Sequence, residues 1–189
     1  MSNALAVPAV TAALSTIVQS AVDACGLHPG AIVSPRLLRD SSDIPTVGVH
    51  LYRVTHDPAL SAIGLPGSPS GADPGQPPHV ALNLHYLISL RGNTEWETQQ
   101  LAAACAAMLH VVPILTAKHF ADAEAEHPQI TGHDLIAARN QVRITPDKLS
   151  IEELNGVWAL YPPGSFALTL AVSAGPVLVN GDSVASGAG

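Results

Sequence analysis

The most regular hydrophobic pattern of the chain lies between residues 79 and 115. In its first half every second position is apolar: Val80, Leu82, Leu84, Tyr86, Ile88 and Leu90. A period of two over this length predicts a long strand with one fully buried face. The residues between them are expected on the opposite, more polar face: Ala81, Asn83, His85, Leu87 and Ser89.

A turn and an amphipathic helix follow this strand. Arg91-Gly92-Asn93 has turn chemistry. Thr94 and Glu97 are spaced as a capping box, in which the Thr94 hydroxyl accepts from the Glu97 N–H and the Glu97 carboxylate accepts from the Thr94 N–H. The apolar period then becomes helical, with Leu101, Ala104, Cys105, Met108 and Leu109 on one stripe. Val112-Pro113 ends the helix, because the residue before a proline avoids the helical region.

Periodicity predicts further elements on both sides of this core unit. Helices are expected over 4–23 and 115–127, and a second capping box, Ser150 to Glu153, opens a third helix that runs through Trp158. A short helical turn is expected after 131–134. Strands are expected over 31–33, 45–54, 140–144, 166–172 and 177–179, and Gly175-Pro176 separates the last two.

Two segments are not expected to contribute to the core. Residues 61–79 are dominated by Gly, Pro and Ser, which predicts a mobile loop between two strands of the same domain. Residues 181–189 are small and polar and predict a flexible tail. Residues 1–180 are therefore expected to form a single domain, as a chain of 189 residues permits.

Composition narrows the class of function. Hydrophobic residues make up 47% of the chain and charged residues only 12%, and a surface so thinly charged favours assembly over a soluble monomer. The net charge is −7, with no cluster of Lys and Arg, which disfavours nucleic-acid binding. Cys25 and Cys105 are expected to be buried, reduced thiols. Neither a signal peptide nor a membrane span is expected.

The nine histidines raise the question of a metal site. The short fixed ligand spacings of zinc sites are absent from the sequence, so neither metal nor cofactor is expected. His50 and His85 lie on the polar faces of two predicted strands and are able to approach each other. We interpret them as ordinary surface histidines.

Sequence patterns that suggest an enzyme lack the context that catalysis requires. Ser173 follows a strand in a degenerate nucleophile elbow, but no helix comes next and no histidine lies downstream. Gly181-Asp182-Ser183 resembles a hydrolase block without partners after it. Glu152 and Glu153 are adjacent, point in different directions on a helix and are explained by capping. Trp96 and Trp158 are expected in core or subunit packing.

Five blocks of the sequence resemble the cap, or tail-terminator, family of contractile injection systems, which are phage-tail-like particles of the antifeeding-prophage and virulence-cassette type. The blocks occur in the family's order: residues 51–60 (LYRVTHDPAL), 78–90, 101–115, 149–158 and 166–179. Two positions depart from the family pattern. Asp57 stands where the family usually has Asn, and residues 166–173 lack the family's usual Arg and Tyr.

Together with the predicted elements, the resemblance implies an α/β (α+β mixed) domain, tail-terminator-like, with a mixed, mostly antiparallel sheet flanked by helices. It implies a non-enzymatic structural protein that forms a homohexameric ring with itself. That ring would bind the sheath protein and the inner tube protein, end their polymerisation and hold the sheath extended. Assembly would take place in the bacterial cytoplasm as part of a contractile particle, with release of the particle left open.

Strand pairing at a sheet edge is the expected means of attachment, because sheath subunits of these machines donate strands to one another. The expected contact residues lie in the two C-terminal strands: Phe166, Leu168, Leu170, Val177, Leu178 and Val179. Two alternatives stay open at this point, a hydrolase and a small-ligand-binding domain. The second would need convergent polar groups in an apolar pocket.

Overall fold

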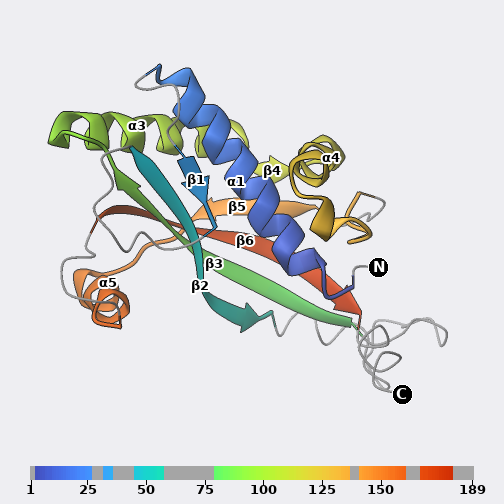
Figure 1. Ribbon diagram of the computed structural model, residues 1–189. Coiled ribbons are helices and arrows are strands. Elements are labelled where there is room, and N and C mark those ends of the chain that lie inside the picture. The colour runs from blue at the N-terminus through green and yellow to red at the C-terminus, as the bar shows by residue number, and fades with distance from the viewer. Residues whose placement is uncertain are drawn as a thin grey trace.

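A computed structural model of the chain describes residues 3–26, 32–35, 45–57, 79–136, 141–160 and 167–180. Figure 1 shows a curved sheet with long helices packed on one face. The strands are β1 (Ile32–Ser34), β2 (Thr46–His56), β3 (His79–Arg91), β4 (Ile114–Leu115), β5 (Val142–Pro146) and β6 (Leu168–Asn180). The helices are α1 (Ala6–Ala24), α3 (Glu95–Val111), α4 (Ala117–Glu126) and α5 (Ile151–Trp158), with a 3-10 turn, η2 (Pro128–Ile130).

The sheet has the strand order β1-β2-β3-β6-β5-β4. The pairing of β1 with β2 is parallel, and the four other pairings are antiparallel. The long strands β3 and β6 lie at the centre, while both edge strands are short, as expected of edges protected against unwanted pairing. The expected mixed, mostly antiparallel sheet flanked by helices is confirmed.

The core lies between this sheet and α1, α3 and α4, on what we call the helical face. The predicted apolar side of β3 supplies its centre, because Leu84, Tyr86 and Ile88 are fully buried. Tyr86 also reaches α1, where its hydroxyl lies 2.9 Å from the Thr11 hydroxyl. Burial raises the pKa of Tyr86 well above its ordinary value.

Helix α1 is long and apolar enough to cross a membrane by length and composition alone. In the structure 61% of that stretch is buried, and its residues Val10, Leu14 and Val18 are fully enclosed against the sheet and the neighbouring helices. The core helix of a folded domain passes the same test. The hydropathy of α1 is therefore explained by packing, which the amphipathic stripe in its sequence predicts.

The first turn of α3 differs in one detail from the expected capping box. Thr94 caps the helix by accepting from the Glu97 N–H at 3.2 Å, as predicted. The Glu97 carboxylate, however, accepts from the Asn93 N–H at 2.8 Å, one residue before the expected donor. The chain approaches the helix closely here, since a Cβ at Gly92 would lie 2.6 Å from the Glu97 Cβ. At α5 both halves of the predicted box are present, between Ser150 and Glu153.

The opposite face of β3 is less polar and less exposed than its sequence suggests. Ala81, Leu87 and Ser89 are all fully buried, whereas Val80, expected on the buried side, is 36% exposed. Leu87 lies between His50 of β2 and Ala171 of β6 in the sheet register. The side chains of the neighbouring strands lie beside those of a central strand on the same face, so alternation overstates the contrast in exposure between its two faces.

The two C-terminal strands expected from the sequence form a single strand, β6. Gly175-Pro176 does not separate them: the chain passes through this pair, whose peptide bond is cis, with a shift of register opposite Leu82 and Leu84. A side chain at Gly175 would require the Asn83 carboxamide of β3 to move. The hypothesis of two short strands was wrong because the proline lies at a bulge, where a ladder donor is dispensable.

Smaller differences concern the region between α3 and β5. The sequence did not reveal β4, and α4 begins two residues later than expected. Residues 131–134, which are expected to lead into a helical turn, include a buried His133, whose Nδ1 accepts from the Leu135 N–H at 2.9 Å. The predicted mobile loop up to residue 78, the tail 181–189 and Phe166 lie outside the described residues.

Candidate functional site

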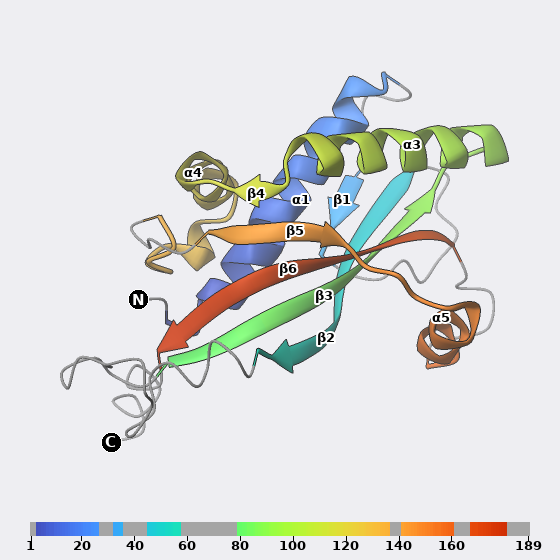
Figure 2. The same cartoon turned by 180° about the vertical axis from the view of Figure 1, so that it is seen from behind.

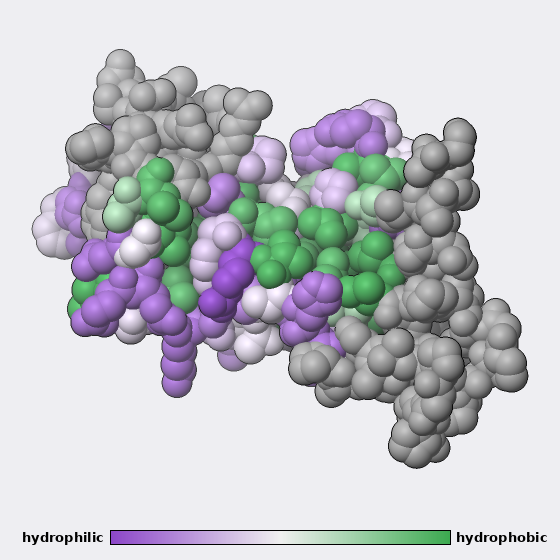
Figure 3. All heavy atoms as spheres, turned by 90° about the horizontal axis from the view of Figure 1, so that it is seen from below, coloured by the Kyte–Doolittle hydropathy of each residue, from purple (hydrophilic) through white to green (hydrophobic). Residues whose placement is uncertain are grey.

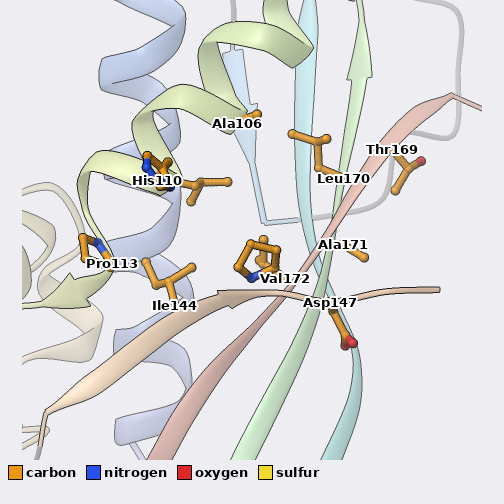
Figure 4. A pocket seen from close by; sticks show the side chains of 11 residues that line it. Ala106, His110, Pro113, Ile144, Asp147, Thr169, Leu170, Ala171 and Val172 are labelled. Atoms are coloured by element: carbon orange, nitrogen blue, oxygen red, sulfur yellow. The ribbon is translucent and has the colours of Figure 1, made fainter.

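A pocket of about 400 Å³ lies between α3 and the sheet, and we call it the α3–β6 groove. Figure 4 shows its walls: α3 above, β5 on one side and β6 across the floor. The lining residues are Ala106, Leu109, His110, Pro113, Ile144, Pro146, Asp147, Thr169, Leu170, Ala171 and Val172. Because carbon surface predominates, the groove is suited to apolar groups rather than to polar substrates.

The groove exists because β5, which runs antiparallel to β6, leaves the sheet before it reaches the first residues of β6. Their last paired residues are Pro146 and Val172, and a final backbone bond runs from the Asp147 N–H to the Ala171 carbonyl at 2.9 Å. The chain then departs toward α5. Strand β6 continues to Leu168 with β3 on its other side, so this end of β6 has a neighbour on one side only among the described strands.

A polar cluster occupies the opposite face of the sheet. His85 of β3 is 13% exposed and bridges two strands. Its Nδ1 lies 2.8 Å from the Asp147 carboxylate, just beyond β5, and its Nε2 lies 3.0 Å from the Thr55 hydroxyl of β2. Tyr52 sits at a bulge in β2 with its ring edge-on to His85, and the Arg53 guanidinium lies 5.8 Å from the centre of that ring.

The two hydrogen-bond distances that join Thr55 to His85 and His85 to Asp147 are those of a hydroxyl–imidazole–carboxylate relay. Such a relay activates nucleophiles in hydrolases. The α3–β6 groove includes Asp147 but neither Thr55 nor His85 in its lining. The relay is thus not directed into this pocket. We interpret it as a hydrogen-bonded link that ties β2, β3 and the end of β5 together.

Tyr52 is the least satisfied member of this cluster. Its hydroxyl is buried and has no hydrogen-bond partner within the described residues. Burial raises the pKa of Tyr52, and the negative charges of Asp147 and Glu153 raise it further, against the lowering effect of Arg53. Glu153 belongs to α5, which therefore lies on this side of the sheet, away from α1 and α3 (Figure 2).

The predicted contact residues of the C-terminal strand have unequal access to a partner. Leu168 is 39% exposed, and Leu170, Leu178 and Val179 are half-buried. Val177 is fully buried in the core and is removed from the candidate surface. The hypothesis that these residues form an edge strand was wrong, because β6 lies between β3 and β5. Only its beginning, around Leu168 to Leu170, extends past β5.

His50 and His85 lie on the same face of the sheet, because His50 is opposite Leu87, two residues along β3 from His85. No group of residues suited to hold a metal ion occurs in the described part of the chain. Trp158 packs with Ala167 and Leu154 in a small cluster, whereas Trp96, expected in core or subunit packing, is 80% exposed and contributes nothing to the core.

Exposed apolar side chains are not confined to Trp96. Val111 lies at the other end of α3, and Ile151 and Leu160 flank α5, all three largely exposed. Figure 3 shows the molecule from below, where hydrophobic residues gather in the middle of the view with hydrophilic residues beside them. Several apolar surfaces thus remain uncovered, as the low charge content of the sequence predicts.

The family model described as the Pvc16 N-terminal domain matches residues 9–189. The chain belongs to this family. The recognition of the cap family from the five sequence blocks is thereby confirmed. No curated protein matches the chain.

Two solved structures are similar to this Pvc16 N-terminal domain. One is the sheath/tube terminator of an extracellular contractile injection system, PVC, in its extended state: 20% identity, TM-score 0.47, 87% of this chain and 56% of that one. The other is the tube-terminating cap of the anti-feeding prophage: 17% identity, TM-score 0.49, 86% of this chain and 54% of that one. The chain thus spans about half the length of these two proteins.

Proposed function

We propose that this chain is the cap, or tail terminator, of a contractile injection system. Its role is to bind the last ring of the inner tube and of the sheath, to stop their growth and to hold the sheath extended. The observation that carries the proposal is the family match, which extends over nearly the whole chain. The role is structural, and assembly takes place in the bacterial cytoplasm as part of the particle.

A homohexameric ring is the proposed form of the protein. Exposed Trp96 and Val111 on α3, with Ile151 at the start of α5 and Leu160 just after it, supply apolar area at two separate elements. Two different patches that meet head to tail generate a closed ring when the rotation between copies is a simple fraction of a turn. A closed ring leaves no lateral surface free, and growth of the tube and the sheath stops because the outward face of this ring binds no further ring.

Contact with the sheath or the tube is proposed at the beginning of β6. Of the residues expected there, Leu168 and Leu170 have accessible area beside the α3–β6 groove. Leu178 and Val179, at the other end of the strand, are half-buried and are the weaker candidates.

The decisive experiment removes the gene and examines the particles by electron microscopy. We expect tubes and sheaths of variable, increased length, or sheaths that contract spontaneously, and restoration by the wild-type gene. Particles of normal length and stability without the gene would refute the proposal. The mass of the purified protein in solution, measured by analytical ultracentrifugation, should correspond to six copies. A strictly monomeric protein at the concentration reached in particles would contradict the ring.

Hydrolysis is the second candidate function, and the geometry of Thr55, His85 and Asp147 is the observation that favours it. The test is release of nitrophenol from p-nitrophenyl acetate by the wild type and by Thr55→Val. We expect equal, background rates from both, because the relay serves as a structural link. A wild-type rate that Thr55→Val abolishes would establish an esterase.

A further inference from the structure

We propose that α4 is an acid-sensitive helix, which a neutral histidine caps near neutral pH and which loosens when that histidine takes up a proton. The histidine is His119, in the first turn of α4. Helix α4 packs against α1 (Figure 1), and its Phe120 is buried in the core. Loosening of α4 therefore exposes apolar surface that is covered at neutral pH. The inference concerns the protein by itself and does not depend on the proposed function.

The start of α4 is capped by an uncommon side chain. The Thr116 N–H donates to the His119 Nδ1 at 3.1 Å, and the Thr116 hydroxyl lies 3.2 Å from the same nitrogen. In the usual capping box a Glu or Gln occupies this third helical position and accepts from the N-cap N–H. A backbone N–H can only donate, so Nδ1 is unprotonated and the proton of the neutral ring lies on Nε2.

Protonation of His119 removes this cap. An imidazolium carries a proton on each nitrogen, so Nδ1 can no longer accept from the Thr116 N–H. The Thr116 hydroxyl can accept from the new Nδ1–H, but it does not replace the lost acceptor of the backbone N–H. The new charge also lies at the positive end of the helix dipole, where a cation is unfavourable. Both effects favour opening of the first turn of α4.

The surroundings of His119 favour the neutral ring. His119 lines a pocket of about 190 Å³ between α1, α3 and α4. Among the described residues of this lining, α1 and α3 contribute uncharged side chains, and α4 contributes Lys118 and Asp122. Desolvation lowers the pKa of His119 below its ordinary 6.5, Lys118 lowers it further, and Asp122 opposes them. The other carboxylate of α4 near α1, that of Glu126, accepts from the Thr16 hydroxyl two turns further along the helix.

The pH range of the response follows from the direction of this pKa shift. When α4 is open, His119 takes up a proton near the ordinary pKa of 6.5, whereas in closed α4 it does so less readily. The stabilisation from the neutral cap is therefore complete above 6.5 and is lost as the pH falls from there through the lowered pKa of closed α4. Helix α5 is the internal comparison, because its cap uses Glu153, and a carboxylate keeps accepting in this range.

A second histidine beside α4 is the competing origin of an acid response. His133 is buried, its ring centre lies 5.4 Å from that of Phe120, and its Nε2 lies 3.4 Å from the Glu124 carboxylate. Its Nδ1 also accepts from a backbone N–H, that of Leu135. A response that begins at His133 would persist without His119, so a variant of His119 separates the two.

Nuclear magnetic resonance of the isolated protein tests the cap in the wild type. The ring nitrogens of His119 should show an unprotonated Nδ1 and a protonated Nε2 at neutral pH. Between pH about 7.5 and about 5, protection of the Thr116 and Phe120 amides against hydrogen exchange, corrected for the intrinsic rate, should fall about fivefold or more. The Ser150 and Leu154 amides, which hold the same places at α5, should keep their protection within about twofold.

The deciding variant is His119→Gln, since glutamine accepts in this position and does not titrate. Helix α4 should form as in the wild type, checked by circular dichroism, and its protection should no longer fall in acid. His127→Gln, the same exchange at the other end of α4, is the matched control and should keep the acid response.

Three results would overturn the inference. The first is a His119 ring with its proton on Nδ1 at neutral pH, which is read in the wild type and needs no variant. The second is unchanged protection of the Thr116 and Phe120 amides on acidification of the wild type. The third is an equal acid response in His119→Gln, which would assign the response to His133 and Glu124.

Discussion

Replacing His85 should destabilise the protein more than its place on a polar strand face suggests. Alternation along β3 predicts a mild effect, because His85 lies on the side opposite the core. In the structure its ring accounts for two hydrogen bonds, to Thr55 and to Asp147, and joins residues that are far apart in the sequence. His85→Ala removes both bonds and leaves a hydroxyl and a carboxylate without this partner.

The magnitude follows from the two bonds and from their exposure. A neutral hydrogen bond contributes about 1 kcal/mol to stability, and one that involves a charged group contributes about 1.5–3 kcal/mol. Asp147 is 23% exposed, so water replaces part of the lost bond. We therefore expect His85→Ala to lower the free energy of unfolding by about 2 kcal/mol, a substantial share of a typical total of about 5–15 kcal/mol.

Urea unfolding of single and double variants measures the link directly. The coupling energy between His85→Ala and Asp147→Asn should be about 1–2 kcal/mol. The exposed pair of Lys118 and Asp122 on α4 is the control and should give a coupling of at most about 0.5 kcal/mol. A coupling at His85 and Asp147 no larger than that of the control pair would show that the link contributes nothing to stability, and the reasoning would fail.

Four further outcomes are expected. Leu84→Ala in the core should cost about 2–5 kcal/mol in urea unfolding, whereas Val80→Ala, partly exposed on the same strand, should cost under about 1.5 kcal/mol. Burial raises the pKa of the Cys105 thiol to about 12 from an ordinary 9.0, so the unfolded chain loses this proton first and stability should fall as the pH rises from 9 to 12, less so in Cys105→Ala. Elemental analysis should find well under one equivalent of zinc or iron; a stoichiometric metal lost with His50→Ala would contradict this. Limited proteolysis should cut first within 61–79, and protection there would mean that the segment is packed.

Local sequence patterns predict most of the secondary structure of the described part of this chain. The long strand β3, the helices α1, α3 and α5 and the helix starts at Thr94 and Ser150 all follow from periodicity and capping, which depend on residues only a few positions apart. The family resemblance adds the kind of sheet and the class of protein, because its blocks keep their order along the chain. A structural, non-enzymatic assembly protein is thus expected from the sequence alone.

The candidate site could be predicted only in part. The C-terminal strand was expected to carry the contact, and Leu168 and Leu170 do lie beside the groove. The walls of the groove had no signal in the sequence, because Ala106, His110 and Pro146 come from separate elements and are unremarkable in each. Val177 alternates like its neighbours and gives no indication that it is fully buried.

The sequence by itself determined most of the helices and strands and which side of each is apolar. Only the tertiary structure decided which strands became neighbours. Pairing across the sheet joins residues far apart along the chain, such as Leu90 with Leu168, and no local pattern encodes that choice. This pairing of strands placed β6 inside the sheet instead of at its edge, and it brought His85 within hydrogen-bond distance of Asp147. It also opened the groove where β5 departs, because a gap between elements is a property of their arrangement and of no single element.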